Sequence, residues 1–434
     1  MPTTPPPSSP PPPSRPPTPP PPLRNWAGNV AFAHTAVHRP STLDELRRLV
    51  RDSPRIRALG SGHSFSRVAD SDHELVRLDG MPQDIVLDPG AGTVEVAAGT
   101  SYADLSAALH RDGFALANMA SLPHISVAGS CATGTHGSGD GQRCLAASVR
   151  AVQMVGPEGD LVELARDTDP DTFPGAVVAL GALGVVTRLT LDVEPAFEVA
   201  QRVHLDVPLD AVAERFDAVF GAAYSVSAFT DWDRDTADVW LKHRTDLPER
   251  PWEGGRPADG PVHPVPGMPA ESCTVQLGVS GPWHERLPHF RPDVTPSAGD
   301  ELQSELYLPR EQAARAFAAL RGIGHKVAPL LHVSEVRTVR GDDLWLSPAY
   351  GRDSVTFHFT WVSDAEAVVA VLAEVEALLA PLGARPHWGK LTTLSAGEVV
   401  AGYGRADDFA RLARSMDPGG TFRNAFTDAL FPRG

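Results

Sequence analysis

The sequence predicts an α+β fold built around an antiparallel sheet, and two features of the chain predict it. Strand-like segments at residues 273–279, 335–339 and 355–362 alternate with helix-like segments at 310–323 and 366–380, a pattern typical of α+β units. Earlier in the chain, two pairs of β-rich runs flank turns rich in Pro and Gly and predict hairpins. No G-x-G-x-x-G motif follows a strand, so a Rossmann dinucleotide site is unsupported, and so is a P-loop.

The first 200 residues supply the remaining elements in order. Residues 1–22, of which 14 are proline, predict a disordered polyproline-II tail, either a spacer or a ligand for a proline-binding module. Structure is expected to begin near Asn25, and a helix over residues 41–50 has Ser41 or Thr42 as its N-cap. The patterns that follow predict a strand at 55–60, a hairpin over 84–101, a helix over 102–113, a hairpin over 149–164 and a strand over 184–195.

The pattern of strand-like and helix-like segments changes near residue 200 and again near the end of the chain. The change near residue 200 predicts a domain boundary. In the last 45 residues the pattern predicts one helix, over 406–416. The Phe-rich strip at 422–431 is expected to pack back on the first domain.

Composition and charge argue against several classes of function. A chain of 434 residues, 42% hydrophobic and 21% charged, fits two or three domains with a real core. A net charge of -16 without a basic stripe disfavours nucleic acid and anionic membranes as partners. The chain has no run of 18 apolar residues that would predict a membrane span, and its N-terminus lacks the basic start and apolar centre expected of a signal peptide. Three scattered cysteines, Cys131, Cys144 and Cys273, predict neither a disulfide framework nor a thiolate metal site, so we expect a reducing, cytoplasmic location.

Segments rich in glycine and small polar residues form the candidate cofactor site. Residues 60–64 read Gly-Ser-Gly-His-Ser directly after a strand, and their small side chains leave the imidazole of His63 open to meet a flat ring. Residues 121–139 offer backbone N–H groups and hydroxyls that can cradle a pyrophosphate, and residues 180–186 can lie along the same ligand. A tight turn with an exposed histidine and a flexible linker are the alternatives. Apolar anchors such as Ile125 argue against the linker.

These segments together resemble the vanillyl-alcohol-oxidase superfamily of FAD enzymes. In that family a strand followed by a G-x-G-H-S turn presents the histidine that bonds to the flavin 8α-methyl carbon. Several longer segments are similar to those of the alditol oxidases within the superfamily, and the resemblance extends over the chain from residue 25 onward. The segments are NWAGN (25–29), LGSGHSF (59–65), HPVPGMPA (263–270), GPWHERLPHFR (281–291), WLSPAYGRD (345–353) and RPHWGK (385–390).

The resemblance implies a PCMH-type FAD-binding domain of two subdomains, with a cap domain that holds the substrate on an antiparallel sheet. Residues 25–198 and 386–434 would form the FAD domain, and residues 199–385 the cap. It also implies that FAD is bound covalently through His63 and that O2 is reduced to H2O2. The implied substrates are small polyols such as xylitol or sorbitol, oxidised at a primary hydroxyl to the aldose. The implied FAD contacts besides His63 are Leu59, Gly60, Ser61, Gly62, Ser64, Ser121, Ser126, Gly129, Thr133, Gly134, Thr135, His136, Gly184, Val185 and Val186. No metal is implied, and we expect a monomer.

Strand periodicity indicates the candidate substrate site. Glu335 and Arg337 are two residues apart and share one face of a strand, as do His358 and Thr360 on the next β-rich segment. A buried polyol needs hydrogen-bond donors and acceptors together, and these side chains supply both. A surface ion pair and a satisfied core histidine are the alternative interpretations. The opposite face of the second segment is aromatic and predicts a core behind the site: Phe357, Phe359 and Trp361.

The resemblance implies that Lys390, in the RPHWGK segment, is the active-site lysine beside the flavin N5–C4a edge. It also implies that Ser121 and Gln303 lie in the substrate pocket. Lys390 acts as a base only where burial or a cation such as Arg337 lowers its pKa. It can instead hold the hydroxyl or the reduced flavin electrostatically. The expected catalytic residues are Lys390, Arg337, Glu335 and His358, and the expected substrate contacts are Ser121, Gln303, Glu335, Arg337 and Thr360.

Cys131 stands where the family has a small aliphatic residue, and we expect it to be a buried small side chain rather than a second flavin link.

Three other functions fit part of the pattern. A sugar-lactone oxidase or dehydrogenase of the same superfamily would share His63 and Lys390. A metal-dependent hydrolase would use some of the 16 histidines, but no H-E-x-x-H motif is present. A non-catalytic flavin carrier would need no polar pocket beside the ring.

Overall fold

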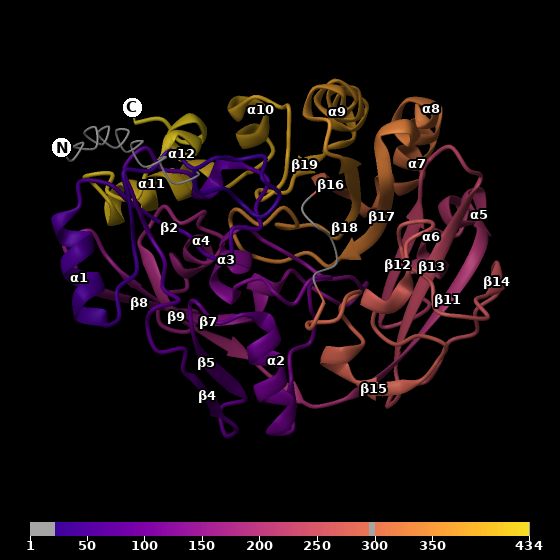
Figure 1. Cartoon of the computed structure of the whole chain (residues 1–434), viewed down its shortest axis with the longest axis horizontal. Helices are drawn as coiled ribbons and strands as arrows, with labels where there is room; N and C mark the ends of the chain where they lie inside the picture. Colours follow the sequence, from indigo (N-terminus) through magenta and orange to yellow (C-terminus); the bar gives the residue numbers. More distant parts are fainter. Residues whose placement is uncertain (1–21, 295–299, 434) are drawn as a thin grey trace, which may run out of the picture.

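The computed structural model describes residues 22–294 and 300–433. The predicted proline-rich tail at residues 1–22 lies outside the described residues except for Pro22. Helices and mainly antiparallel sheets make up the described chain, which confirms the predicted α+β class (Figure 1). No helix within the described ranges has the length and hydropathy needed to cross a membrane.

The first part of the chain contains two sheets and a short strand pair. A parallel sheet has the order β1 (Ala36–His38), β3 (Glu74–Val76), β2 (Ile56–Ala58), and an antiparallel sheet has the order β4 (Ile85–Asp88), β5 (Thr93–Ala97), β9 (Val185–Asp192), β7 (Val149–Val155), β8 (Leu161–Ala165). The strands β6 (Phe114–Ala115) and β10 (Glu194–Pro195) pair with each other. Both predicted hairpins are therefore confirmed, since β4 pairs with β5 and β7 with β8.

The helices of this part begin and end where local sequence signals place them. The side chain of Thr42 caps α1 (Leu43–Asp52) by accepting from the Glu45 N–H at 3.2 Å, which selects Thr42 over Ser41 as the N-cap. Helix α2 (Tyr102–Arg111) is followed by Gly113 at a φ of 82°, a conformation that glycine adopts without a steric penalty. The short helices are α3 (Val127–Ala132) and α4 (Phe173–Ala176).

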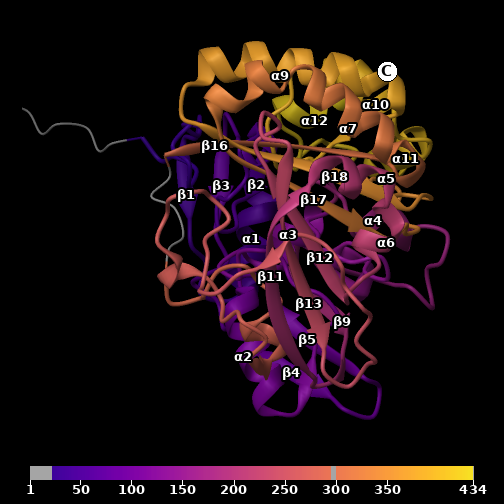
Figure 2. The same ribbon diagram turned by 90° about the vertical axis from the view of Figure 1, so that its right-hand side faces the viewer.

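A nine-stranded sheet dominates the middle of the chain. Its order is β14 (Arg256–Pro257), β11 (Glu198–Pro208), β13 (Thr236–Arg244), β12 (Ser225–Thr230), β17 (Leu331–Val339), β18 (Ser354–Val362), β16 (Glu301–Pro309), β19 (Arg385–Pro386), with β15 (Ser280–Pro282) also paired to β11. The helices packed on it are α5 (Leu209–Glu214), α6 (Phe216–Phe220), α7 (Ala313–Gly322) and α9 (Ala365–Leu379), with α8 (Gly324–Val327) beside α7 (Figures 1 and 2). Phe357, Phe359 and Trp361 of β18 lie in the core that these helices cover, as predicted. The opposite face of the central strands is left for the site.

One predicted strand is wrong. Residues 273–279 form an irregular loop rather than a strand. Leu277 and Gly278 have φ angles of 62° and 74°, and two consecutive left-handed residues cannot continue an extended strand. Val275, Leu277 and Val279 are exposed there, so their apolar character does not report on a buried strand.

The end of the chain holds more helix than predicted, and it packs against the beginning. The predicted helix is confirmed as α11 (Ala406–Met416), but α10 (Ala396–Ala401) and α12 (Ala425–Leu430) were not predicted. Phe422 lies in one core with Leu46 and Ile56. Figure 1 shows α11 and α12 beside the N-terminal elements, so the C-terminal segment packs against the first part of the chain, as expected.

Candidate active site

A cavity of about 770 Å³ lies where the nine-stranded sheet meets the first part of the chain. One end is lined by the turn at residues 60–64 and by small residues between 120 and 136, and the other by polar side chains of β16, β17 and β18. Its volume is in the upper half of the range typical of small-molecule and cofactor sites. The cavity is therefore large enough for an extended ligand with a polar group at one end.

Most of the expected FAD contacts line this cavity. They are Leu59, Gly60, Ser61, Gly62, His63, Ser64, Ser121, Ser126, Gly129, Thr133, Thr135, His136, Gly184 and Val186. Two of the expected contacts do not. Val185 points to the opposite side of β9 from Val186 and is fully buried in the core with Leu46. Gly134 forms a left-handed turn, and a Cβ at that position would meet Pro348 at 2.9 Å.

The glycine-rich end of the cavity fits a large cofactor held by small side chains. Added Cβ atoms at Gly60 and Gly129 would lie 2.6 and 2.7 Å from the Ser126 hydroxyl oxygen, so only glycine lets these segments meet there. The Ser126 Oγ is buried and has no hydrogen-bond partner in the described chain. A buried unpaired hydroxyl calls for a polar ligand atom, and Ser126 is placed to bind one. Cys131 is buried and absent from the cavity lining, as expected.

All seven residues expected at the substrate end line the cavity: Ser121, Gln303, Glu335, Arg337, His358, Thr360 and Lys390. Strand register explains the convergence. Glu335 of β17 and Glu305 of β16 are both paired with His358 of β18, so the three side chains form a row on one face of the sheet. Gln303 is paired with Thr360, two residues along each strand from the Glu305 and His358 pair, so it lies on the same face.

Glu305 is the centre of this polar cluster and was missed by the sequence analysis. Its side chain is 1% exposed, and it accepts from Arg337 Nη2 at 2.7 Å and lies 2.9 Å from His136 Nε2. Its other oxygen is 3.3 Å from Lys390 Nζ. Burial alone would raise the pKa of Glu305, but Arg337, Lys390 and His136 hold it well below its usual range. Glu305 is therefore an anion that fixes both cations of the site.

The ammonium of Lys390 is surrounded by three acceptors. Its Nζ is 3.0 Å from Gln303 Oε1, 2.7 Å from His358 Nδ1 and 3.3 Å from Glu305 Oε2. Burial lowers the pKa of His358 to about 4, with Lys390 adding to the effect, so the ring is neutral and its Nδ1 accepts. The Nε2 of His358 then donates to Thr360 Oγ1 at 3.1 Å. Three acceptors match the three N–H bonds of a charged lysine, although burial lowers the pKa of Lys390.

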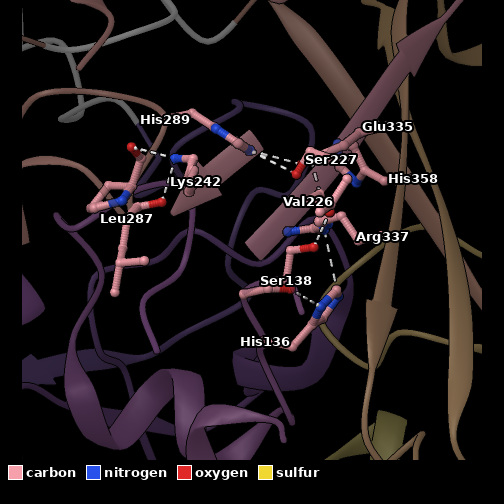
Figure 3. Close-up of polar contacts among 12 residues, drawn as sticks. His136, Ser138, Val226, Ser227, Lys242, Leu287, His289, Glu335, Arg337 and His358 are labelled. Carbon is pink, nitrogen blue, oxygen red and sulfur yellow. Dashed lines mark hydrogen bonds and ion pairs between the residues drawn. The ribbon is translucent and has the colours of Figure 1, made fainter. Parts of the chain in front are cut away.

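Glu335 is held from the other side by a histidine that the sequence analysis also missed. His289 Nε2 lies 2.8 Å from Glu335 Oε1 (Figure 3), and Arg337 Nε lies 3.5 Å from the other oxygen. Burial would raise the pKa of Glu335, but Arg337 and His289 lower it. Glu335 is therefore charged, and it presents an anionic acceptor to the cavity.

Lys242 is a fully buried lysine that supports this wall of the cavity (Figure 3). Its Nζ donates to the carbonyl oxygens of Arg286, Leu287 and Pro288 at 2.9, 2.6 and 3.0 Å. Those carbonyls immediately precede His289 in the chain. Burial lowers the pKa of Lys242 to about 7, but its three carbonyl partners need three N–H donors, so the charged form fits the geometry. Lys242 thus fixes the segment that carries His289.

Replacing Lys242 with methionine is expected to lower the melting temperature and to raise the KM for substrate. Three buried carbonyls would lose their donor, at a cost of about 1–3 kcal/mol for each unsatisfied group, and His289 would no longer be held against Glu335. Thermal unfolding and steady-state kinetics measure the two effects. Lys326→Met is the matched control, since Lys326 is 45% exposed and pairs with Glu374 at the surface. An unchanged KM in the Lys242 variant would contradict the proposed support of His289.

Comparison with known proteins extends these findings. Residues 34–165 match the FAD binding domain family model, and residues 301–430 match the model of D-arabinono-1,4-lactone oxidase. Alditol oxidase from Streptomyces sp. (strain IKD472 / FERM P-14339) is 52% identical over 408 residues, which cover 93% of this chain and 97% of that relative. This chain belongs to the alditol oxidase family. The resemblance inferred from the sequence segments is thereby confirmed.

Matches at lower identity include a lactone dehydrogenase and a solved oxidase structure. L-gulono-1,4-lactone dehydrogenase from Mycobacterium tuberculosis (strain ATCC 25618 / H37Rv) is 27% identical and covers 93% of this chain and 97% of the relative. The crystal structure of cholesterol oxidase from B. sterolicum has a TM-score of 0.75 at 15% identity, covering 95% of this chain and 96% of that chain. That likeness confirms the predicted fold. The chain is an FAD-dependent oxidoreductase with the PCMH-type fold.

Proposed function

We propose that this enzyme oxidises a primary hydroxyl of small polyols, such as xylitol or sorbitol, to the aldose, and reduces O2 to H2O2. The observation that carries the proposal is the polar end of the cavity. There, anionic acceptors, cationic donors and neutral groups that do both stand on one wall: Glu335, Arg337, Lys390, Gln303 and Thr360. A chain of hydroxyls, each of which donates and accepts, needs such a mixed wall when it leaves water.

We propose that residues 25–198 and 386–434 bind FAD and that residues 199–385 form the cap over the substrate. The cofactor would lie along the glycine-rich end, with Ser126 and the neighbouring small residues against its polar atoms and His63 as the covalent attachment point. When bound, FAD accepts a hydride from the carbinol carbon and passes the electron pair to O2. The remaining chemistry is the work of the chain's own side chains.

The protein residues stabilise charge on the reacting hydroxyl. Lys390 and Arg337 are cations at the polar end of the cavity, and a positive charge there favours loss of the hydroxyl proton as hydride leaves. The proton is released to solvent, and the reduction of O2 to H2O2 takes a proton up. We propose that Lys390 acts in its charged form, because all three of its N–H bonds meet acceptors. Glu335 binds a further hydroxyl as acceptor. Glu305 touches no bulk solvent and holds Lys390 and Arg337 in position.

A lactone-directed activity is the second candidate, because the match to the D-arabinono-1,4-lactone oxidase model, residues 301–430, includes Glu305, Glu335 and Lys390. Kinetics on xylitol and on an aldonolactone, with H2O2 measured, separate the two. We expect the larger kcat/KM on xylitol, with one H2O2 formed for each aldose. A preference for the lactone would overturn the polyol assignment, and transfer of electrons to a dye but not to O2 would overturn the assignment as an oxidase.

A further inference from the structure

The N-terminal turn at residues 25–30, here called the clamp turn, wraps around the His63 turn. The Trp26 N–H donates to the Gly62 carbonyl at 2.8 Å. The side-chain amide of Asn25 donates to the Ser64 carbonyl at 2.9 Å, and that of Asn29 donates to the Phe65 carbonyl at 2.9 Å. The clamp turn therefore binds backbone oxygens on both sides of His63.

The clamp turn is itself closed by hydrogen bonds and is therefore a rigid support. The backbone N–H of Asn25 donates to the Val30 carbonyl at 3.0 Å, and the Val30 N–H donates to the Asn25 side-chain oxygen at 2.9 Å. The Asn25 amide also donates to Asn29 Oδ1 at 2.6 Å. These bonds orient both asparagine side chains toward the His63 turn.

The C-terminal segment holds the same turn from its other end. The Phe65 N–H donates to the Gly389 carbonyl at 2.7 Å, and the Ser66 hydroxyl donates to the Trp388 carbonyl at 2.7 Å. Gly389 immediately precedes Lys390, so the His63 turn and the lysine segment are fixed to each other. Backbone hydrogen bonds thus set where the Cα of His63 lies, but they do not set the direction of its ring.

The ring of His63 is oriented by Trp26. Their ring centroids are 5.2 Å apart with an interplanar angle of 19°, a stacked arrangement. The imidazole makes no hydrogen bond to the described part of the chain, so the stack on Trp26 is the contact with a defined geometry that the ring does make. Burial, with a smaller effect of His124, lowers the pKa of His63 to about 4. The ring is therefore neutral and keeps one unprotonated nitrogen.

We propose that the clamp turn, and Trp26 above all, positions the His63 imidazole for covalent attachment of the flavin. The inference rests on the proposed covalent link through His63. Attachment joins a ring nitrogen of His63 to the flavin 8α-carbon, and the 8α-carbon and the imidazole each lose one proton. The nitrogen lone pair forms the new bond, the electron pair of the broken C–H bond stays on the flavin ring system, and O2 takes up that pair and the two protons to give H2O2. A misplaced ring would slow this step, because bond formation depends steeply on the geometry of the reacting atoms.

The test measures covalent and total flavin separately in Trp26→Ala. Full-length protein is harvested at successive times after induction. The covalent fraction is the flavin that remains with the acid precipitate divided by the total flavin bound before precipitation. An aromatic stack contributes enough to change a rate about two- to tenfold. We expect covalent flavin to accumulate more slowly by that factor, at unchanged total flavin. Trp26→Phe is expected to restore the wild-type rate.

The control is Trp252→Ala, since Trp252 packs on His204 at 5.6 Å and does not line the cavity. It should accumulate covalent flavin as the wild type does. Wild-type rates in Trp26→Ala would overturn the inference, and so would a loss of total flavin that accounts for the loss of covalent flavin. Wild-type protein that releases all its flavin into acid would instead overturn the covalent link itself. The wild-type and variant measurements thus distinguish the two failures.

Discussion

Replacing Glu305 with glutamine is expected to lower kcat by about 100-fold or more, because Arg337 and Lys390 lose the anion that positions them, and a misplaced active-site group costs about 100-fold. Glutamine has nearly the shape of glutamate but no charge. Arg337 and Lys390 would then repel each other across the position that Glu305 holds, 2.7 and 3.3 Å from their nitrogens. FAD content is expected to stay unchanged, because Glu305 lies at the polar end of the cavity rather than at the glycine-rich end.

A pH profile tests whether Glu305 acts through Lys390. Glu305 raises the pKa of Lys390, so its removal lowers that pKa further. If charged Lys390 is the active form, the alkaline loss of activity in Glu305→Gln moves to lower pH. Asp342→Asn is the matched control. Asp342 is a buried carboxylate that lies outside the cavity and accepts a hydrogen bond from the Ser347 hydroxyl at 2.6 Å. Full activity in Glu305→Gln would show that the cluster does not need its central anion.

Local patterns predicted the parts of the fold and site that depend on neighbouring residues. The two hairpins follow from β-rich runs on either side of short turns. Glu335 and Arg337 share a face because strand side chains alternate, and the register with β18 brings His358 opposite Glu335. The two unpredicted helices each have six residues and a capping box, at Ser395 and Asn424. So short a helix carries no helical period to detect.

The residues missed at the site are those whose role depends on long-range packing. Glu305 lies two residues after Gln303 on a strand, so alternation alone predicts their shared face. Only the pairing of β16 with β18 brings Glu305 to the centre of the site. His289 and Lys242 come from a loop and a distant strand, and no local spacing connects them. For Val185 the local pattern would have given the better prediction. The resemblance assigned this residue to the cofactor, but the alternation of side chains along β9 directs it into the core.

Replacing Lys390 with methionine is expected to lower kcat by about 100- to 1,000-fold while FAD stays bound, because it removes a positive charge from the polar end of the cavity, where we propose that the alkoxide develops. Methionine keeps the length of the side chain, so the cavity keeps its shape. Lys390→Arg keeps the charge and is expected to retain more activity than Lys390→Met. Turnover on xylitol and flavin absorbance are the measurements. Near-normal turnover in Lys390→Met would contradict the catalytic role.

The pH dependence of Lys390→Arg separates the two roles open to this lysine. A group that acts in its charged form supports activity below its pKa, and activity is lost as pH rises through that pKa. Burial lowers the pKa of Lys390, so we expect the alkaline loss to begin below the usual range of lysine. Arginine stays protonated throughout that range, so Lys390→Arg should abolish the alkaline loss. If wild-type activity instead rises as pH passes through this pKa, neutral Lys390 is the base, and its three acceptor contacts describe a resting state that substrate must break.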